Sequence, residues 1–161
     1  MTYQANPSRR EWMTADGGFL PLRLGMLLSP AYQARTRPLA LILERLEIEH
    51  LRHGGKHNGG LCVSYRQFEE YGVSPRTIRP SLSLGEALGL MQVIQIQEVA
   101  GDIRPENMYR LTYVPERDKK APTDEWRYVT ADQIAKAVEE FRARTTTKKG
   151  QTEAETDFKA A

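Results

Sequence analysis

Apolar side chains recur at helical spacing over residues 38–53, which is the clearest hydrophobic pattern in the chain. One stripe consists of Leu39, Ile42, Leu43 and Leu46. Positions three and four apart lie on one face of a helix, so the stripe predicts a central, mostly buried helix. Gly54 and Gly55 follow directly and are expected to end it.

The residues before this helix carry weaker patterns. Residues 1–17 are polar and predict a flexible N-terminal arm, whereas weak alternation over residues 19–28 predicts an extended lead-in that packs on the core. Ser29 and Pro30 then supply an N-cap and a first-turn proline for a short helix.

Two helices joined by a tight turn are predicted after the central helix. A short strand over residues 61–63 leads to Ser64, a favoured capping residue, and to an amphipathic segment at 65–71. Gly72 ends this second helix, and Ser74 opens a third helix.

Alternating segments rich in β-branched and aromatic residues follow at 90–99 and 108–114. This alternation predicts two strands of a β-hairpin whose tip carries Arg104. The compact domain is therefore predicted to span residues 18–114.

A charged, proline-flanked linker is predicted over residues 115–128, and an amphipathic helix over 129–145. The apolar stripe of this helix consists of Ile134, Val138 and Phe141. The stripe needs a covering surface, which is either the interface of a homodimer or the same domain; the pattern favours neither. Residues 146–161 are polar and predict a disordered tail.

The predicted order of elements is that of a winged helix: an α+β, mainly helical domain with a helix-turn-helix and a β-hairpin wing. The run LCVSYRQFEEYGVSPRTI, followed by ALGLMQV, resembles the winged helix-turn-helix of phage and plasmid replication proteins and of MarR- or GntR-type bacterial regulators. The segment GGFLPLRLGMLLSPAY is similar to the lead-in of the phage replication-protein group. The resemblance implies binding to double-stranded DNA, either in transcriptional regulation or at a replication origin of a phage or mobile element.

Helical spacing divides the third helix, residues 75–88, into two sides. At about 100° per residue, Ile78, Leu82 and Gly85 fall on an inner side. The outer side carries Arg76, Arg79, Pro80 and Ser83. Arginine donors can reach guanine edges or phosphates, and small neighbours allow close approach to the groove. The outer side is therefore predicted to read DNA.

Three further regions are predicted to contact the duplex. The N–H groups at the start of the third helix can bind a phosphate, the start of the second helix can meet the backbone, and Arg104 can enter the minor groove. The complete set of predicted DNA-binding residues is Tyr65, Arg66, Ser74, Pro75, Arg76, Thr77, Arg79, Pro80, Ser83 and Arg104.

Composition limits this interpretation. The chain has 161 residues, of which 40% are hydrophobic and 27% charged, as in one globular domain with polar extensions. Its 23 Lys and Arg residues nearly balance 21 Asp and Glu residues, so net charge alone does not favour a DNA partner. Glu86 on the third helix also lowers the expected number of phosphate contacts. A winged-helix module that binds proteins and not DNA is the alternative.

We expect no enzymatic activity, metal or cofactor. His50, His53 and His57 lie near Cys62, but two glycines interrupt the histidines and no second cysteine is present. Charged residues interrupt the best candidate for a signal segment, and no apolar run reaches the length of a membrane span. A single cysteine fits a reducing compartment, so we expect a cytoplasmic protein without membrane contact.

Overall fold

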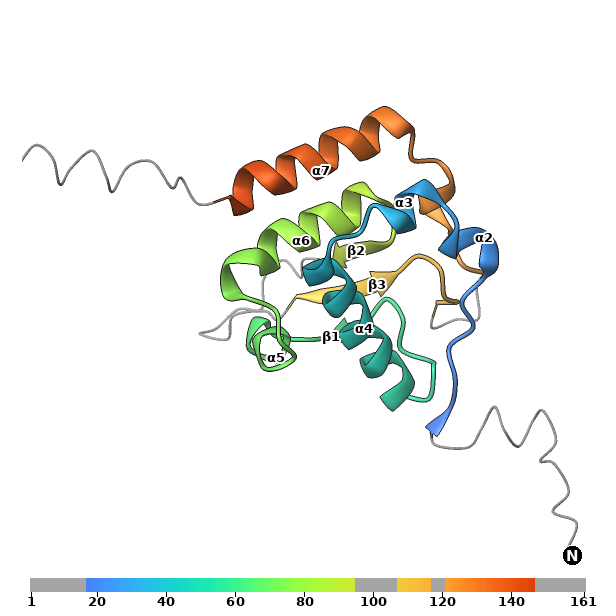
Figure 1. Cartoon of the computed structure of the whole chain (residues 1–161). Coiled ribbons are helices and arrows are strands. Elements are labelled where there is room, and N and C mark those ends of the chain that lie inside the picture. Colours follow the sequence, from blue (N-terminus) through green and yellow to red (C-terminus); the bar gives the residue numbers. More distant parts are fainter. Residues whose placement is uncertain (1–16, 95–106, 117–120, 147–161) are drawn as a thin grey trace, which may run out of the picture.

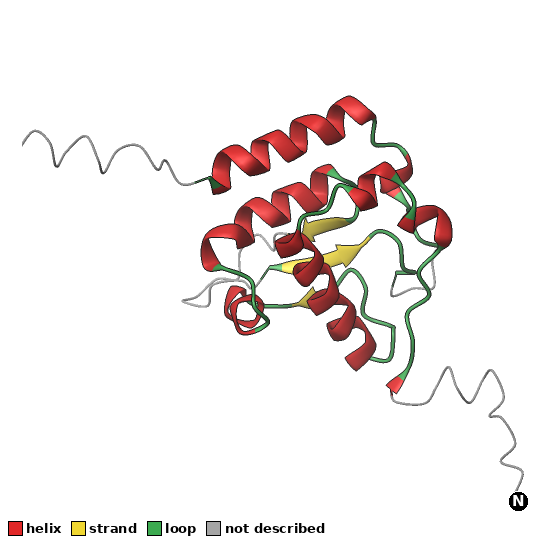
Figure 2. Ribbon diagram, viewed as in Figure 1, coloured by secondary structure: helices red, strands yellow, loops and turns green. Residues whose placement is uncertain are grey.

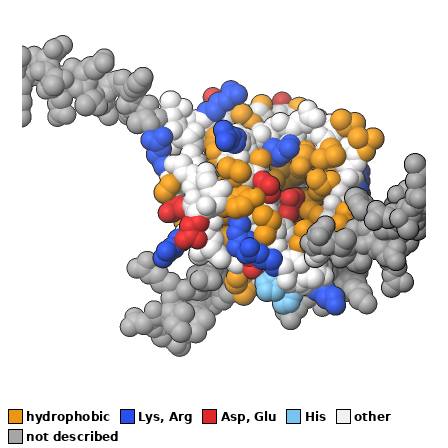
Figure 3. Space-filling view, turned by 60° about the horizontal axis from the view of Figure 1, so that its bottom comes forward, with side chains coloured by type: hydrophobic (Ala, Val, Ile, Leu, Met, Phe, Trp, Pro, Cys, Tyr) orange, Lys and Arg blue, Asp and Glu red, His pale blue; other side chains and the backbone are white. Residues whose placement is uncertain are grey.

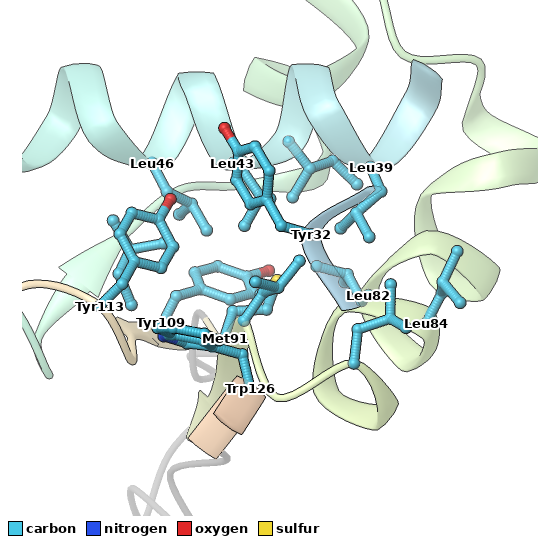
Figure 4. Close-up of a cluster of buried hydrophobic side chains, with 14 of the residues drawn as sticks. Tyr32, Leu39, Leu43, Leu46, Leu82, Leu84, Met91, Tyr109, Tyr113 and Trp126 are labelled. Carbon is cyan, nitrogen blue, oxygen red and sulfur yellow. The ribbon is translucent and has the colours of Figure 1, made fainter. Parts of the chain in front are cut away.

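Helix α4 (Arg37–Arg52) lies at the centre of the computed structural model, which describes residues 17–94, 107–116 and 121–146 (Figure 1). Its position and length confirm the predicted central helix. Figure 4 shows Leu39, Leu43 and Leu46 directed from α4 toward the aromatic rings and aliphatic side chains of the other elements. The apolar stripe therefore forms the base of the core, where burial of each such side chain contributes about 1.5–3 kcal/mol.

The predicted helix-turn-helix segment forms α5 (Tyr65–Glu70) and α6 (Pro75–Ala87). Ser64 and Gln67 form a capping box, in which each side chain bonds to the backbone N–H of the other residue. In the turn, Gly72 adopts a φ of 102°, which glycine tolerates without strain, and Val73 is buried.

The inner side of α6 packs directly on α4. A Cβ atom added at Gly85 would lie 2.8 Å from Met91 Cγ and 3.0 Å from Leu39 Cδ1. Glycine at this position of the inner side therefore permits the close approach of α4 and α6. Ile78 and Leu82 are buried on the same side, as expected.

The described strands form a three-stranded antiparallel sheet in the order β1-β3-β2, with β1 at Leu61–Cys62, β2 at Met91–Ile94 and β3 at Met108–Leu111. All three lie within strands predicted from the sequence. Leu61 pairs with Tyr109, and Met91 pairs with Leu111. The hairpin tip, with Arg104, lies outside the described residues.

The prediction of an extended lead-in over residues 19–28 is wrong in its second half. Residues Leu24–Leu27 form the short helix α2, and the carbonyl of Arg23 accepts hydrogen bonds from the N–H groups of Met26 and Leu27. The helical turn directs Met26 into the core, a tertiary contact that overrides the local pattern. The next helix, α3 (Pro30–Gln33), is capped by Ser29 as predicted.

The predicted linker over residues 115–128 is partly wrong as well, because its second half belongs to the packed domain. The 3₁₀ helix η2 (Glu125–Arg127) places Trp126 in the core with 5% of its surface exposed. The backbone of η2 lies so close to Gly89 that a Cβ there would be 2.7 Å from Trp126 N. The packed domain therefore extends past Val114, its predicted end.

Helix α7 (Ala131–Thr145) lies along α6 (Figures 1 and 2). Its predicted capping box between Thr130 and Gln133 is present. Ile134, Val138 and Phe141 are half-buried against the same domain, so the second of the two predicted arrangements is the one observed. The stripe is therefore partly covered within the chain itself. The predicted tail, apart from Thr146, and the predicted arm, apart from Gly17, lie outside the described residues.

Candidate functional site

The outward surface of α6 is formed by Arg76, Arg79, Ser83 and Glu86, all of which are exposed; we call it the α6 strip. Three of these residues were predicted to lie on the outer side. On one flank, a hollow of about 190 Å³ separates α6 from α5 and the base of the hairpin. The hollow is lined by Tyr65, Arg79, Leu82, Ser83, Glu86, Val93 and Asn107. Helix α7 borders the other flank.

Pro80 does not belong to this strip, and its prediction as a DNA-facing residue is wrong. It is buried within α6 and faces Ala137 and Phe141 of α7. Helical spacing placed Pro80 on the side of α6 that faces away from α4, but α7 packs on that side and buries it. The covering helix is more than fifty positions away in the sequence, so no local pattern could indicate it.

The start of α6 offers fewer donors than predicted. Ser74 occupies the N-cap position, but its side chain makes no capping hydrogen bond. Its carbonyl instead accepts hydrogen bonds from Thr77 N at 2.8 Å and from Thr77 Oγ1 at 2.9 Å. Pro75 has no N–H, and the N–H of Thr77 is already engaged. The phosphate-binding role predicted for this helix start therefore loses two of its amide donors.

The two predicted residues of α5 lie beside the α6 strip. Tyr65 is 40% exposed and lines the hollow, so its ring and hydroxyl are accessible to a partner. Arg66 Nε lies 2.9 Å from Glu70 Oε1 in a pair that is largely exposed on both sides. Exposed pairs of this kind contribute at most about 1 kcal/mol, so Arg66 can exchange its carboxylate partner for a phosphate.

Two polar residues of the hollow were not predicted as site residues. Glu86, noted only for its acidic charge, accepts a hydrogen bond from Val93 N at 2.9 Å through Oε1. One carboxylate oxygen thus holds the N–H of an edge strand, and the charge lies in the α6 strip. Asn107 lies at the base of the hairpin, where its side chain can donate and accept. An Asn in a turn-rich segment gives no sequence signal for such a role.

A buried polar cluster on the sheet was also missed. Arg110 donates hydrogen bonds to Glu116 Oε1 at 2.8 Å, Thr123 Oγ1 at 2.9 Å and Glu125 Oε1 at 2.5 Å. Arg110 alternates with the apolar Tyr109 and Leu111 along β3, yet only 8% of its surface is exposed. Residues 121–127 cover this face of the sheet, which makes Arg110 a structural residue.

The three histidines do not form a metal site. The rings of His53 and His57 lie 4.7 Å apart, and His53 Nε2 lies 3.1 Å from Glu49 Oε1. His50 is buried, and its pKa is lowered by burial and by His57, so its imidazole stays neutral at pH 7. Among the described residues, no group of three or more His, Cys, Asp or Glu side chains is placed to hold a metal ion.

A second cavity, of about 500 Å³, lies between the lead-in, α4 and the end of β3. Its walls are mainly apolar, with Phe19, Leu51 and Tyr113 among them. The polar side chains of the wall are Arg23, which already pairs with Asp124, the neutral His50, and Tyr113, whose hydroxyl donates to Glu47 Oε1 at 2.6 Å. Specific small-molecule sites combine apolar walls with several convergent polar groups, which this cavity does not present.

Charge on one face of the molecule is divided among small groups (Figure 3). On the face shown in Figure 3, Lys and Arg side chains lie in separate places between apolar and acidic ones. No helix in the described ranges has the length and apolar character needed to cross a membrane. Comparison with protein-family models, curated proteins and solved structures finds no match to this chain.

Proposed function

We propose that the chain is a winged helix-turn-helix protein that binds double-stranded DNA through α6. The fold class and the element order support this proposal: helix α4, strand β1, the α5–α6 pair, and the antiparallel strands β2 and β3. The observation that carries it is the α6 strip, an exposed surface with two arginines on the helix that a helix-turn-helix inserts into the major groove.

The geometry suggests how the duplex would be read. Arg79 projects beside the hollow, where its guanidinium can bond to O6 and N7 of a guanine or to a phosphate. Tyr65 and Arg66 would contact the sugar-phosphate backbone at the edge of the groove, which fixes the orientation of α6. Arg104 of the hairpin is proposed to reach the adjacent minor groove.

The biological role is proposed at a coarser level. A cytoplasmic, non-enzymatic DNA-binding protein of this kind acts either as a transcriptional regulator or at a replication origin of a phage or mobile element. Both roles require sequence-specific binding, because each depends on locating one site among many nonspecific ones.

Gel-shift titration of duplex fragments tests the proposal, with Arg79→Ala beside the wild-type protein. Loss of a bidentate base contact costs about 1–3 kcal/mol, which is roughly 5- to 150-fold in affinity. Arg52→Ala is the matched control, since Arg52 is an exposed arginine at the end of α4 outside the α6 strip. The proposal fails if the wild-type protein shifts no duplex at low salt, or if both variants bind alike.

A second candidate function, a protein-docking module, is favoured by one observation. Leu24 and Leu28 on either end of α2 are 70% and 65% exposed, and Leu22 and Phe19 are also exposed. These four exposed apolar side chains come from one short segment of the chain, and large exposed apolar side chains that form a patch are typical of protein interaction sites. This function replaces the first if duplex DNA is not bound at low salt.

A further inference from the structure

Helix α7 brings Arg144 next to the α6 strip. In the sequence, Arg144 lies 61 positions after Ser83, the strip residue that it contacts. Arg144 Nη1 donates to Ser83 Oγ at 3.4 Å, and both side chains are exposed. The guanidinium therefore lies at the edge of the α6 strip, on the flank opposite the hollow next to α5. The acidic Glu86 lowers the number of phosphate contacts expected from α6, and Arg144 adds a basic group beside this helix.

The backbone that carries Arg144 is held firmly against α6. Ala137 is buried and Phe141 is half-buried, and both face Pro80 across a seam that leaves only about 20 Å³ of free space. Phe141 precedes Arg144 by three residues, so both lie on neighbouring parts of one helix face. The capping box at Thr130 fixes the other end of α7. The position of Arg144 is thus set by packing.

The geometry of the DNA major groove relates the position of Arg144 to a phosphate backbone. The major groove of B-DNA is about 12 Å wide and is bordered by one phosphate backbone on each side. If α6 lies in the groove, Tyr65 and Arg66 face one border, and α7 faces the other. We propose that Arg144 contacts a phosphate on the strand opposite the one that α5 contacts, an inference that rests on the proposed DNA binding.

The neighbouring charges agree with this role. Glu140, one turn before Arg144 and on the same flank, has Lys136 Nζ at 4.0 Å. Arg142 is about 160° from Arg144 around the helix axis, because successive residues are separated by about 100°. Arg142 therefore points away from Ser83 and does not line the seam. Arg142 therefore serves as the matched control for Arg144, because both are exposed arginines on the same helix.

Fluorescence-anisotropy titrations with a labelled duplex test the inference, using Arg144→Ala, Arg142→Ala and Arg144→Lys over a range of salt concentrations. Arg144→Ala should weaken binding about equally on different sequences and reduce the magnitude of the salt slope by about one. Arg144→Lys should keep the wild-type slope, because it keeps the charge. Arg142→Ala should match the wild-type protein.

The possible failures are distinguishable. If the wild-type protein binds no duplex, the proposed function fails and this inference fails with it. If the wild-type protein binds and Arg79→Ala weakens it, but Arg144→Ala equals Arg142→Ala, only the role of Arg144 is overturned. A loss that depends strongly on base sequence, or an equal loss of slope in Arg144→Lys, would overturn the phosphate contact. Thermal unfolding of each variant checks that the exposed substitutions leave the fold intact.

Discussion

Arg110 and Arg79 carry the same side chain in opposite environments. Arg110 is buried on the sheet and bonds to side chains from three other segments, whereas Arg79 is exposed on α6 beside a hollow. A guanidinium enclosed by carboxylates has its donors engaged within the protein. An exposed guanidinium on a helix surface can engage an outside partner. Burial, which net charge does not report, therefore separates structural arginines from those that are accessible to an outside partner.

The largest effect expected from this comparison is the loss of stability in Arg110→Ala. The substitution leaves Glu116 and Glu125 without their shared cation and removes the hydrogen bond to Thr123. Breaking a buried pair costs about 3–5 kcal/mol; because both carboxylates keep some solvent contact, we expect about 2–3 kcal/mol. Urea unfolding measures this difference. A change below about 0.5 kcal/mol would show that Arg110 is not structural.

Gly85→Ala tests the buried side of α6 and should have the next largest effect. The added Cβ would approach Met91 and Leu39, and overpacking of this kind costs about 1–3 kcal/mol. The higher helix propensity of alanine offsets about 1 kcal/mol of this cost, so we expect a net loss of up to about 2 kcal/mol in the free energy of unfolding. Denaturant unfolding beside Ala87→Gly, an exposed position on the same helix, separates packing from propensity. Stabilisation by Gly85→Ala would contradict the close approach of α4 and α6.

Much of the fold is predictable from the sequence because its signals are local. The stripe of α4, the capping residue Ser64 and the glycine turn before α6 each act within a few residues of where they occur. The strands also follow from short alternation. The lead-in was mispredicted because Met26 turns inward to meet a core built from distant segments.

The candidate site is predictable only in part. Arg76 and Arg79 follow from helical spacing, which needs no knowledge of the rest of the chain. The burial of Pro80 and the arrival of Arg144 at Ser83 depend on α7, and the burial of Arg110 depends on residues 121–127. Packing between segments that are distant in the sequence does not alter the local pattern of apolar and polar residues. The local pattern therefore predicted exposure for side chains that the fold buries.

Asp124→Asn extends the comparison to a paired carboxylate. We expect it to lower the free energy of unfolding by less than Arg110→Ala or Gly85→Ala, and by an amount that depends on pH. Burial opposes ionisation of Asp124, but hydrogen bonds from Arg23, Trp126 and Arg127 outweigh it and hold its pKa below the usual range. A lowered pKa in the folded state stabilises the protein above the unfolded-state pKa of about 3.9, and this stabilisation is lost as pH falls through the folded-state pKa.

The free energy of unfolding of Asp124→Asn should therefore be lower than that of the wild-type protein at pH 7, and this difference should shrink below about pH 4. Asparagine tolerates the positive φ of 52° at this position, so the substitution changes charge without straining the backbone. Chemical unfolding of both proteins at several pH values measures the difference. A deficit that stays constant from pH 7 to acid would contradict the ionised pair.

Arg79→Ala should have the smallest effect on stability, within about 0.5 kcal/mol, because the side chain is exposed and is not enclosed by carboxylates as Arg110 is. Urea unfolding of Arg79→Ala and Arg110→Ala, measured in parallel, compares the exposed arginine directly with the buried one. A destabilisation by Arg79→Ala as large as that of Arg110→Ala would assign both arginines to the fold.

The salt dependence of duplex binding by the wild-type protein and Arg79→Ala tests the central claim most directly. If the α6 strip binds DNA, the logarithm of the association constant falls linearly with the logarithm of salt concentration, by about 0.9 for each phosphate neutralised. Arg79→Ala should bind more weakly than the wild-type protein, whereas Arg52→Ala should bind equally well. Absence of binding at low salt, or binding that is insensitive to salt and to Arg79→Ala, would contradict DNA recognition by α6.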